Sequence, residues 1–331
     1  MSKLKGRDFI SLLDYSREDI ETILNLAFEL KRKLYASEPH PLLAGKNLGM
    51  MFWNVSTRTR ISFETGMSQL GGHAQYYASE SVHANKLENW VDTAQVVSRY
   101  LDGFVIRLFK MPPPFPPLKY GEARQSLETL AQNASIPVIN AMDDEEHPCQ
   151  TMADMMTIIE KMGPDYRQKK IALVWAPHGH YVPPSMSHSL ALAAMALGMR
   201  LTIAYPPGFD LDPKYMNEAK KRAEQSAGTM EITNSLNEAC EKADVIYSSY
   251  WGVIPNQDDD AKLREQFNDA WRINKGHFDI ANKNAIFMNC MPLQRGMEAT
   301  AEVVDGPMSV IYDEAENRLH TEKAILSLVM G

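Results

Sequence analysis

The stretch Leu48-Gly49-Met50-Met51-Phe52-Trp53-Asn54-Val55-Ser56-Thr57-Arg58-Thr59-Arg60 decides how this chain folds, because an apolar run changes abruptly into hydroxyl and guanidinium side chains. The apolar part predicts a buried strand, and residues 61–65 can begin a helix. A helix N-terminus offers unpaired backbone N–H groups and the positive end of a dipole. Hydroxyl donors and arginine forks add charge-assisted hydrogen bonds. The stretch therefore predicts a phosphate site, with a basic helix cap that holds no ligand as the alternative.

Three further polar clusters follow apolar runs in the same way. They are Val105-Ile106-Arg107, the segment His147-Pro148-Cys149-Gln150, and Asn289-Cys290-Met291-Pro292-Leu293-Gln294-Arg295-Gly296. In open α/β sheets, ligands sit beyond the carboxyl ends of the strands. We therefore expect these clusters to contribute to one functional site.

Strand and helix patterns alternate along the chain. Strands are predicted near residues 47–53, 74–77, 103–107 and 138–140, and again near 170–175, 200–204, 244–248 and 285–289. Helical patterns include 90–101, 151–161 and 315–328, and Ser16-Arg17-Glu18-Asp19 is typical of a capping box. The alternation predicts an α/β fold of two doubly wound parallel-sheet domains with the active site in the cleft between them.

Composition excludes several classes of protein. The 331 residues suffice for two domains, and 44% hydrophobic with 23% charged residues predicts a buried core rather than disorder. A net charge of −8 argues against non-specific nucleic-acid binding. Three cysteines fit a reducing compartment and packing roles rather than a disulfide framework. No signal core and no stretch of about 20 apolar residues is found, so we expect a cytoplasmic protein without a membrane span.

Taken together, the four clusters resemble the aspartate/ornithine carbamoyltransferase family, and so does the closing stretch Asp313-Glu314-Ala315-Glu316-Asn317-Arg318-Leu319-His320. The resemblance covers nearly the whole chain. It implies a carbamoyl-phosphate-binding domain over residues 1–148, joined by a C-terminal helix at 315–331, and an amino-acceptor-binding domain over 149–314. It also implies transfer of a carbamoyl group from carbamoyl phosphate to an amine, with no cofactor and no metal, by a homo-oligomer, at least a trimer.

The resemblance assigns roles to individual residues. Arg107 bridges the phosphate and the carbonyl oxygen, His147 donates to that oxygen, and Gln150 meets the carbamoyl amide. Arg295 and the turn at Cys290 complete the catalytic set. The residues expected to bind carbamoyl phosphate are Ser56, Thr57, Arg58, Thr59, Arg107, His147, Gln150 and Arg295, with Lys86 of a neighbouring subunit. Lys86 could equally be a solvated lysine, and Arg60 is interpreted as a structural ion pair.

The acceptor side departs from the enzymes that use free ornithine. Their Asp-x-Trp-x-Ser-Met-Gly motif is replaced by Ser249-Tyr250-Trp251-Gly252, and Asn289 stands where most members have His. An aspartate there would serve an α-ammonium group, so its loss favours an Nα-acylated ornithine, as in the N-acetylornithine and N-succinylornithine branch. Free ornithine, lysine or a diamine is the alternative. The residues expected to bind the acceptor are Ser185, His188, Trp251, Met291 and Pro292.

The sequence suggests two rival classes of protein, and it leaves the roles of two unusual loops undecided. A dinucleotide-binding dehydrogenase should carry Gly-x-Gly-x-x-Gly after an early strand, and none is found. A noncatalytic member of the fold that binds carbamoyl phosphate is the second rival. The pair His178-x-His180 could bind a metal ion but lacks nearby acidic or thiol ligands in sequence. The run from Pro112 to Pro117 is either a rigid surface linker or a loop near the site.

Overall fold

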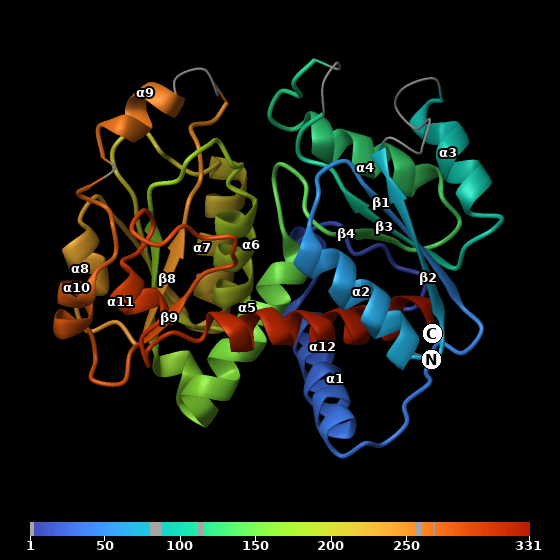
Figure 1. Cartoon of the computed structure of the whole chain (residues 1–331), viewed down its shortest axis with the longest axis horizontal. Helices are drawn as coiled ribbons and strands as arrows, with labels where there is room; N and C mark the ends of the chain where they lie inside the picture. Colours follow the sequence, from blue (N-terminus) through green and yellow to red (C-terminus); the bar gives the residue numbers. More distant parts are fainter. Residues whose placement is uncertain (1–2, 80–87, 112–115, 256–259, 268) are drawn as a thin grey trace. The chain divides into compact units, whose positions relative to one another are not determined.

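The computed structural model describes residues 3–79, 88–111, 116–255, 260–267 and 269–331, and it divides the chain into two compact units. Unit 1 comprises Met1–Met156 with Glu316–Gly331, and unit 2 comprises Thr157–Ala315. The first boundary falls within helix α5 (Pro148–Met162) and the second within helix α12 (Ile311–Met330). Figure 1 shows strands and helices alternating within each unit.

Unit 1 contains a parallel sheet in the order β2-β1-β3-β4. Its strands are β1 (Asn47–Phe52), β2 (His73–Ala78), β3 (Gly103–Arg107) and β4 (Val138–Asn140). The helices before α5 are η1 (Leu12–Asp14), α1 (Arg17–Tyr35), α2 (Thr57–Gln69), α3 (Trp90–Val97) and α4 (Glu122–Asn133). The first strand in the sequence, β1, therefore lies inside the sheet, where β2 pairs with one of its edges and β3 with the other.

Unit 2 contains a second parallel sheet, in the order β7-β6-β5-β8-β9. Its strands are β5 (Lys170–Trp175), β6 (Arg200–Ala204), β7 (Thr229–Thr233), β8 (Val245–Ser249) and β9 (Ile286–Met288). The helices are η3 (Gly163–Gln168), α6 (Ser185–Ala196), α7 (Pro213–Ser226), α8 (Leu236–Cys240), α9 (Asp260–Glu265), α10 (Lys275–Ile280) and α11 (Ala301–Val304). The predicted α/β class with two parallel sheets is confirmed.

Two expectations about these elements need correction. Helix α2 begins at Thr57 and not near residue 61, because Ser56 is its N-cap and Ser56 Oγ accepts a hydrogen bond from the Thr59 backbone N–H over 3.3 Å. Strand β7 was not predicted. It lies at the edge of the sheet with none of its residues fully buried, so its sequence carries no continuous apolar run.

The predicted capping box at the start of α1 is confirmed. Ser16 Oγ accepts from the Asp19 N–H over 3.2 Å, and Asp19 Oδ2 accepts from the Ser16 N–H over 3.1 Å. Each side chain thus satisfies a backbone donor that the helix itself leaves unpaired.

Helix α12 packs on α1 and α2 of unit 1, as Figure 1 shows in red against blue. Lys323 Nζ donates to Gln69 Oε1 over 2.8 Å, and Lys31 Nζ donates to Asn317 Oδ1 over 2.8 Å. A Cβ at Gly66 would lie 3.2 Å from Lys323 Cγ, so glycine allows α2 and α12 to approach closely. The last helix of the chain is therefore an integral part of unit 1.

Each unit has its own core. In unit 1 the core includes Trp53 and Trp90, whose ring centroids are 5.0 Å apart. In unit 2, Trp175 packs against Phe209 and Tyr250 at centroid distances of 4.8 and 5.7 Å. Among the residues described, no helix combines the length and apolar character needed to cross a bilayer.

Candidate active site

The Ser56–Thr59 segment forms the cap and first turn of α2, directly beyond the carboxyl end of β1. Ser56 Oγ donates to Thr59 Oγ1 over 2.9 Å while it caps the helix. The partly buried Arg58 lies in this first turn, at the end of the helix that carries the positive end of the dipole. The predicted phosphate-binding chemistry is therefore assembled at a helix N-terminus.

Arg107 is brought beside this turn by the strand order. Strands β1 and β3 are neighbours, with Phe52 paired to Arg107, and the connections from β1 and β3 lead to opposite sides of the sheet. This is the topological switch point at which open α/β sheets bind ligands. Arg107 Nη1 donates to the Ala141 carbonyl over 3.0 Å, which fixes one side of its guanidinium.

His147 stands immediately before α5, whose first residue is Pro148. Proline is favoured at the first helical position because its missing N–H would be unpaired there in any case. Burial first, and then the charges of Arg318, Arg107 and Arg58, hold the pKa of His147 well below its ordinary 6.5. The imidazole is therefore neutral at physiological pH and can donate one hydrogen bond while the three guanidiniums supply positive potential.

Arg318 on α12 joins two of the predicted motifs, although it is not among the residues expected to form the site. Its Nη1 donates to Gln150 Oε1 over 2.7 Å, and its Nη2 donates to Thr59 Oγ1 over 3.1 Å. Glu322 accepts from Arg318 Nε over 2.9 Å and from Nη2 over 2.5 Å, and both residues are buried. The only sequence signal was the position of Arg318 within the family-like stretch that closes the chain.

Gln150 is held on its other side within the same unit. Its Nε2 donates to Asp154 Oδ1 over 2.8 Å, one turn further along α5. With Arg318 on its oxygen, the amide is fixed in orientation at the end of α5 that also carries His147. Thr59, Arg107, His147 and Gln150 are thus brought together by unit 1, with Arg318 added to them.

In unit 2, Asn289 organises the turn that contains Cys290. Its Nδ2 donates to the Ser248 carbonyl over 3.0 Å, its Oδ1 accepts from the Met291 N–H over 2.7 Å, and its own N–H donates to Glu314 over 2.9 Å. Cys290 and Met291 are partly buried, whereas Pro292 is exposed. The predicted turn therefore lies beyond the carboxyl end of β9 as expected.

Three residues expected to bind the acceptor are fully buried in unit 2: Ser185, His188 and Trp251. His188 Nε2 accepts from the Asp212 N–H over 3.1 Å, and its ring stacks on Tyr215 with centroids 4.4 Å apart. Trp251 Nε1 donates to the Phe209 carbonyl over 2.8 Å. These contacts favour packing roles for His188 and Trp251.

Arg295 is exposed and forms a forked ion pair within unit 2. Its Nε and Nη2 both donate to Asp305, at distances between 2.6 and 3.0 Å. The hydrogen bond that Arg295 donates to Asp305 is the main cause that raises the pKa of Arg295. The role expected for Arg295 at the carbamoyl group stays a prediction.

Arg60 pairs with Glu64 over 3.0 Å on the surface of α2, which confirms the interpretation of Arg60 as part of a structural ion pair.

The cysteines and the His-x-His pair were weighed as reactive or metal-binding groups. Burial raises the pKa of Cys149, and it raises that of Cys240 to about 12, which supports packing roles for both. His178 Nδ1 lies 2.6 Å from the buried Glu298 Oε1, and the His180 ring is exposed. Within the described ranges, no three potential ligands are grouped to hold a metal ion.

Two expectations lie outside the described residues. Lys86 falls in the segment 80–87, and most of the proline run falls in 112–115. The subunit contact expected through Lys86 stays a prediction.

Comparison with known families matches both halves of the chain. A model described as "Aspartate/ornithine carbamoyltransferase, carbamoyl-P binding domain" matches residues 7–160. A second, "Aspartate/ornithine carbamoyltransferase, Asp/Orn binding domain", matches residues 168–329. The first match contains Ser56–Thr59, Arg107, His147 and Gln150, and the second contains the Cys290 turn and Arg318.

Individual relatives are similar over almost their whole length. The ornithine carbamoyltransferase of Halalkalibacterium halodurans is 40% identical, with 99% of this chain and 96% of the relative covered. That of Thermococcus kodakarensis is also 40% identical, with 99% and 98% covered. The structure of ornithine carbamoyltransferase from Pyrococcus furiosus superposes with a TM-score of 0.88 at 38% identity, covering 100% of this chain and 99% of that one. An acetylornithine transcarbamylase complexed with acetylcitrulline gives a TM-score of 0.88 at 30% identity, with 98% and 99% covered.

Proposed function

Because the chain belongs to the aspartate/ornithine carbamoyltransferase family, we propose that it transfers the carbamoyl group of carbamoyl phosphate to the side-chain amine of ornithine. The neutral amine nitrogen forms a bond to the carbonyl carbon, and the bond from that carbon to the phosphate oxygen breaks. The amine gives up one proton, which the departing phosphate can take up, and citrulline and phosphate are released. The chain is a carbamoyltransferase by family, and the acceptor is the part that we propose.

One observation carries the proposal: Arg318 bonds to both Thr59 and Gln150, and His147 stands immediately before the helix that carries Gln150. Carbamoyl transfer needs donors for a phosphate and for a carbonyl oxygen that gains negative charge in the transition state. In our proposal the first turn of α2 and the arginines bind the phosphate, and His147 donates to the carbonyl oxygen. A scaffold protein has no use for buried, preorganised donors of this kind, which argues against the noncatalytic alternative.

Gln150 has a role consistent with its fixed amide. Its Oε1 accepts from Arg318 and its Nε2 donates to Asp154, so neither end can rotate without breaking a buried hydrogen bond. We propose that Gln150 contacts the carbamoyl amide. Arg318 would then orient Gln150 and Thr59 together, and it adds positive charge beside the phosphate.

For the acceptor, the relatives argue against our expectation of an Nα-acylated ornithine. Those at 39–40% identity over nearly the full chain are named ornithine carbamoyltransferases, whereas the structures named for acetylornithine are near 30% identical. The buried positions of His188 and Trp251 also weaken the argument from these residues, because their polar atoms are already bonded inside unit 2. We therefore propose free ornithine as the acceptor, with Met291 and Pro292 beside it.

The direct test is phosphate release from carbamoyl phosphate with a panel of amines, read together with mass spectrometry of the ureido product. The panel contains ornithine, N-acetylornithine, N-succinylornithine, lysine, putrescine and aspartate. We expect ornithine to give the highest kcat/KM and citrulline to be the product. A preference for an N-acyl compound would restore the expectation from the sequence, and no turnover with any amine would support the noncatalytic alternative.

The assembly and the location of the protein are also proposals. We propose a homotrimer in the cytoplasm, in which Lys86 of one subunit completes the site of its neighbour. Light scattering measures the oligomer directly. Mixing of an inactive Lys86→Ala subunit with an inactive Arg58→Ala subunit should restore part of the activity if sites are shared.

A further inference from the structure

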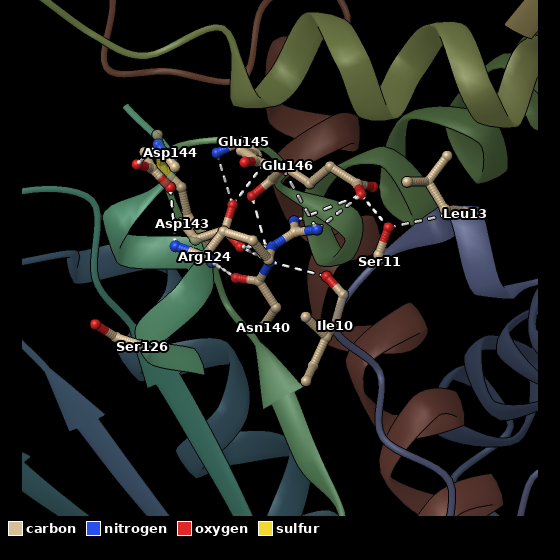
Figure 2. Close-up of polar contacts among 12 residues, drawn as sticks. Ile10, Ser11, Leu13, Arg124, Ser126, Asn140, Asp143, Asp144, Glu145 and Glu146 are labelled. Carbon is tan, nitrogen blue, oxygen red and sulfur yellow. Dashed lines mark hydrogen bonds and ion pairs between the residues drawn. The ribbon is translucent and has the colours of Figure 1, made fainter. Parts of the chain in front are cut away.

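A buried network of charged side chains lies directly before His147 in unit 1. Arg124 on α4 faces the loop that contains Asp143 and Glu146, and all three side chains are almost completely removed from solvent. Figure 2 shows the Arg124 guanidinium between Asp143, Asn140 and Glu146. Buried charges are costly, so a network of this kind needs a compensating role or full pairing.

Asp143 is the centre of the loop. Its Oδ2 accepts from Arg124 Nε over 2.5 Å and from Asn140 Nδ2 over 3.0 Å. Its Oδ1 accepts from the backbone N–H groups of Glu145 and Glu146, over 2.8 and 2.6 Å. One carboxylate therefore determines the backbone course of the residues that immediately precede His147.

Glu146 connects the same loop to the N-terminal segment of the chain. Its carboxylate accepts from the Ser11 hydroxyl and, over 2.9 Å, from the Leu12 N–H at the start of η1. Arg124 reaches Glu146 Oε1 from both terminal nitrogens over 3.5 Å. The residue adjoining His147 is thus held from η1 on one side and from α4 on the other (Figure 2).

The same loop also holds Arg107. The Ala141 carbonyl accepts from Arg107 Nη1 over 3.0 Å, and the Met142 carbonyl accepts from the Leu108 N–H over 3.0 Å. Met142 has a φ of 137°, an unfavourable conformation for a residue with a side chain, and its N–H donates to Asn140 Oδ1 over 2.9 Å. A strained backbone needs strong surrounding contacts to persist, and the network supplies them.

The buried carboxylates of Asp143 and Glu146 depend on Arg124 for a balancing positive charge. Asp143 and Glu146 are fully buried, and the guanidinium of Arg124 bonds to both of them. Burial raises the pKa of Glu146, whereas the Arg124 charge is the largest influence that lowers it. Neighbouring Asp144 is committed to the N-terminus of α4, where it accepts from the Gly121 and Arg124 N–H groups over 2.7 and 3.0 Å. Without Arg124, the carboxylates of the loop would repel each other.

We propose that Arg124 is a positioning residue for carbamoyl transfer, which acts through Asp143 and Glu146 to hold the loop 141–147 so that Arg107 and His147 point at the same substrate. The inference rests on the roles proposed above for Arg107 and His147. The Arg124 guanidinium bonds to Asp143 and Glu146 on this loop, so in our proposal it acts on the reaction through the loop. Removing it loosens the two groups that must meet the carbonyl oxygen.

The test compares Arg124→Gln with wild-type protein in steady-state kinetics with carbamoyl phosphate and ornithine. We expect kcat to fall about 10- to 100-fold, because a displacement of about 1 Å at the reacting groups costs this much. The affinity for inorganic phosphate, measured by calorimetry, should fall less than kcat, because the Ser56–Thr59 donors belong to α2, whereas Arg107 is held by the loop. Arg124→Lys keeps the charge and should restore part of kcat.

Two controls separate positioning from general loss of stability. Arg222→Gln removes another buried arginine, paired with Glu218 on α7 in unit 2, and should lower the melting temperature without lowering kcat. The His147 ring resonance, assigned with His147→Gln, should shift and broaden in Arg124→Gln but not in Arg222→Gln. If Arg124→Gln does not fold, Ser11→Ala, which removes the hydroxyl bond to Glu146 and the cap on the Leu13 N–H, should fold and still lower kcat measurably.

The outcomes distinguish this inference from the proposed function. A wild-type protein that forms no ureido product with any amine would overturn the proposed function. An active wild-type protein whose kcat is unchanged by Arg124→Gln would overturn the positioning role alone. Where Arg124→Gln does not fold, full kcat in Ser11→Ala would overturn the positioning role.

Discussion

Arg318 Nη1 donates a hydrogen bond to Gln150 Oε1 over 2.7 Å, so the last helix of the chain holds a side chain of the His147–Gln150 segment in place. The same guanidinium bonds to Thr59 in the first turn of α2. Arg318 therefore belongs to the site and to the fold of unit 1 at once, and its removal should affect both.

Arg318→Met should lower the free energy of unfolding by about 3–5 kcal/mol, because it leaves the buried Glu322 carboxylate without its partner. Urea denaturation measures the change. Adding Glu322→Gln should recover part of the stability but not the activity. Arg60→Met is the control, since its exposed pair with Glu64 contributes at most about 1 kcal/mol. Equal losses in the two arginine variants would contradict the interpretation.

Arg58→Ala should abolish carbamoyl-phosphate binding and change stability by no more than about 0.5–1 kcal/mol. Arg58 is only partly buried, in the first turn of α2, so the fold depends on it little, whereas the phosphate loses a charged donor. Calorimetric titration and thermal melting give the two numbers. Arg60→Ala, two positions along the same helix, should bind normally. A folded Arg58→Ala protein with unchanged affinity would refute the assigned role.

Stability should fall in mild acid because of His320. Burial lowers the pKa of His320 to about 4, whereas the unfolded chain keeps an ordinary value near 6.5. Between these values only the unfolded state binds the proton, so stability is lost as the pH falls through this window. By pH 5 the loss should reach about 2 kcal/mol relative to pH 7.5. His320→Gln cannot take up this proton, and a wild-type loss no larger than that of the variant would contradict the assignment.

His188→Asn should lower the free energy of unfolding by about 1–3 kcal/mol and leave the order of preferred amines unchanged. The ring is buried, stacks on Tyr215 and accepts from the Asp212 N–H, so the substitution removes packing and leaves that donor poorly paired. Denaturation and the amine panel report the two effects. A reordered panel would instead establish His188 as an acceptor residue, the role predicted from the sequence.

The local sequence pattern was sufficient to locate most of the strands of the two sheets. Strands β3, β4, β5 and β6 have the predicted bounds, because buried parallel strands read as continuous apolar runs between turn residues. Strand β7 was missed because an edge strand is only half buried. The start of α2 was placed too late because the hydroxyls of Ser56 and Thr59 were read as ligands for phosphate, although Ser56 also caps the helix.

The sequence by itself determined the chemistry of the site, since hydroxyls, arginines and a histidine follow apolar strands and match one family in order. Only the tertiary structure decided which groups meet. Arg318 lies 168 positions from Gln150 and 259 from Thr59, and Ser11 lies 135 from Glu146. Side-chain hydrogen bonds over such separations leave no periodic signal along the chain. They form only after the parallel sheet and the last helix have brought the ends of β1, β3 and α5 together.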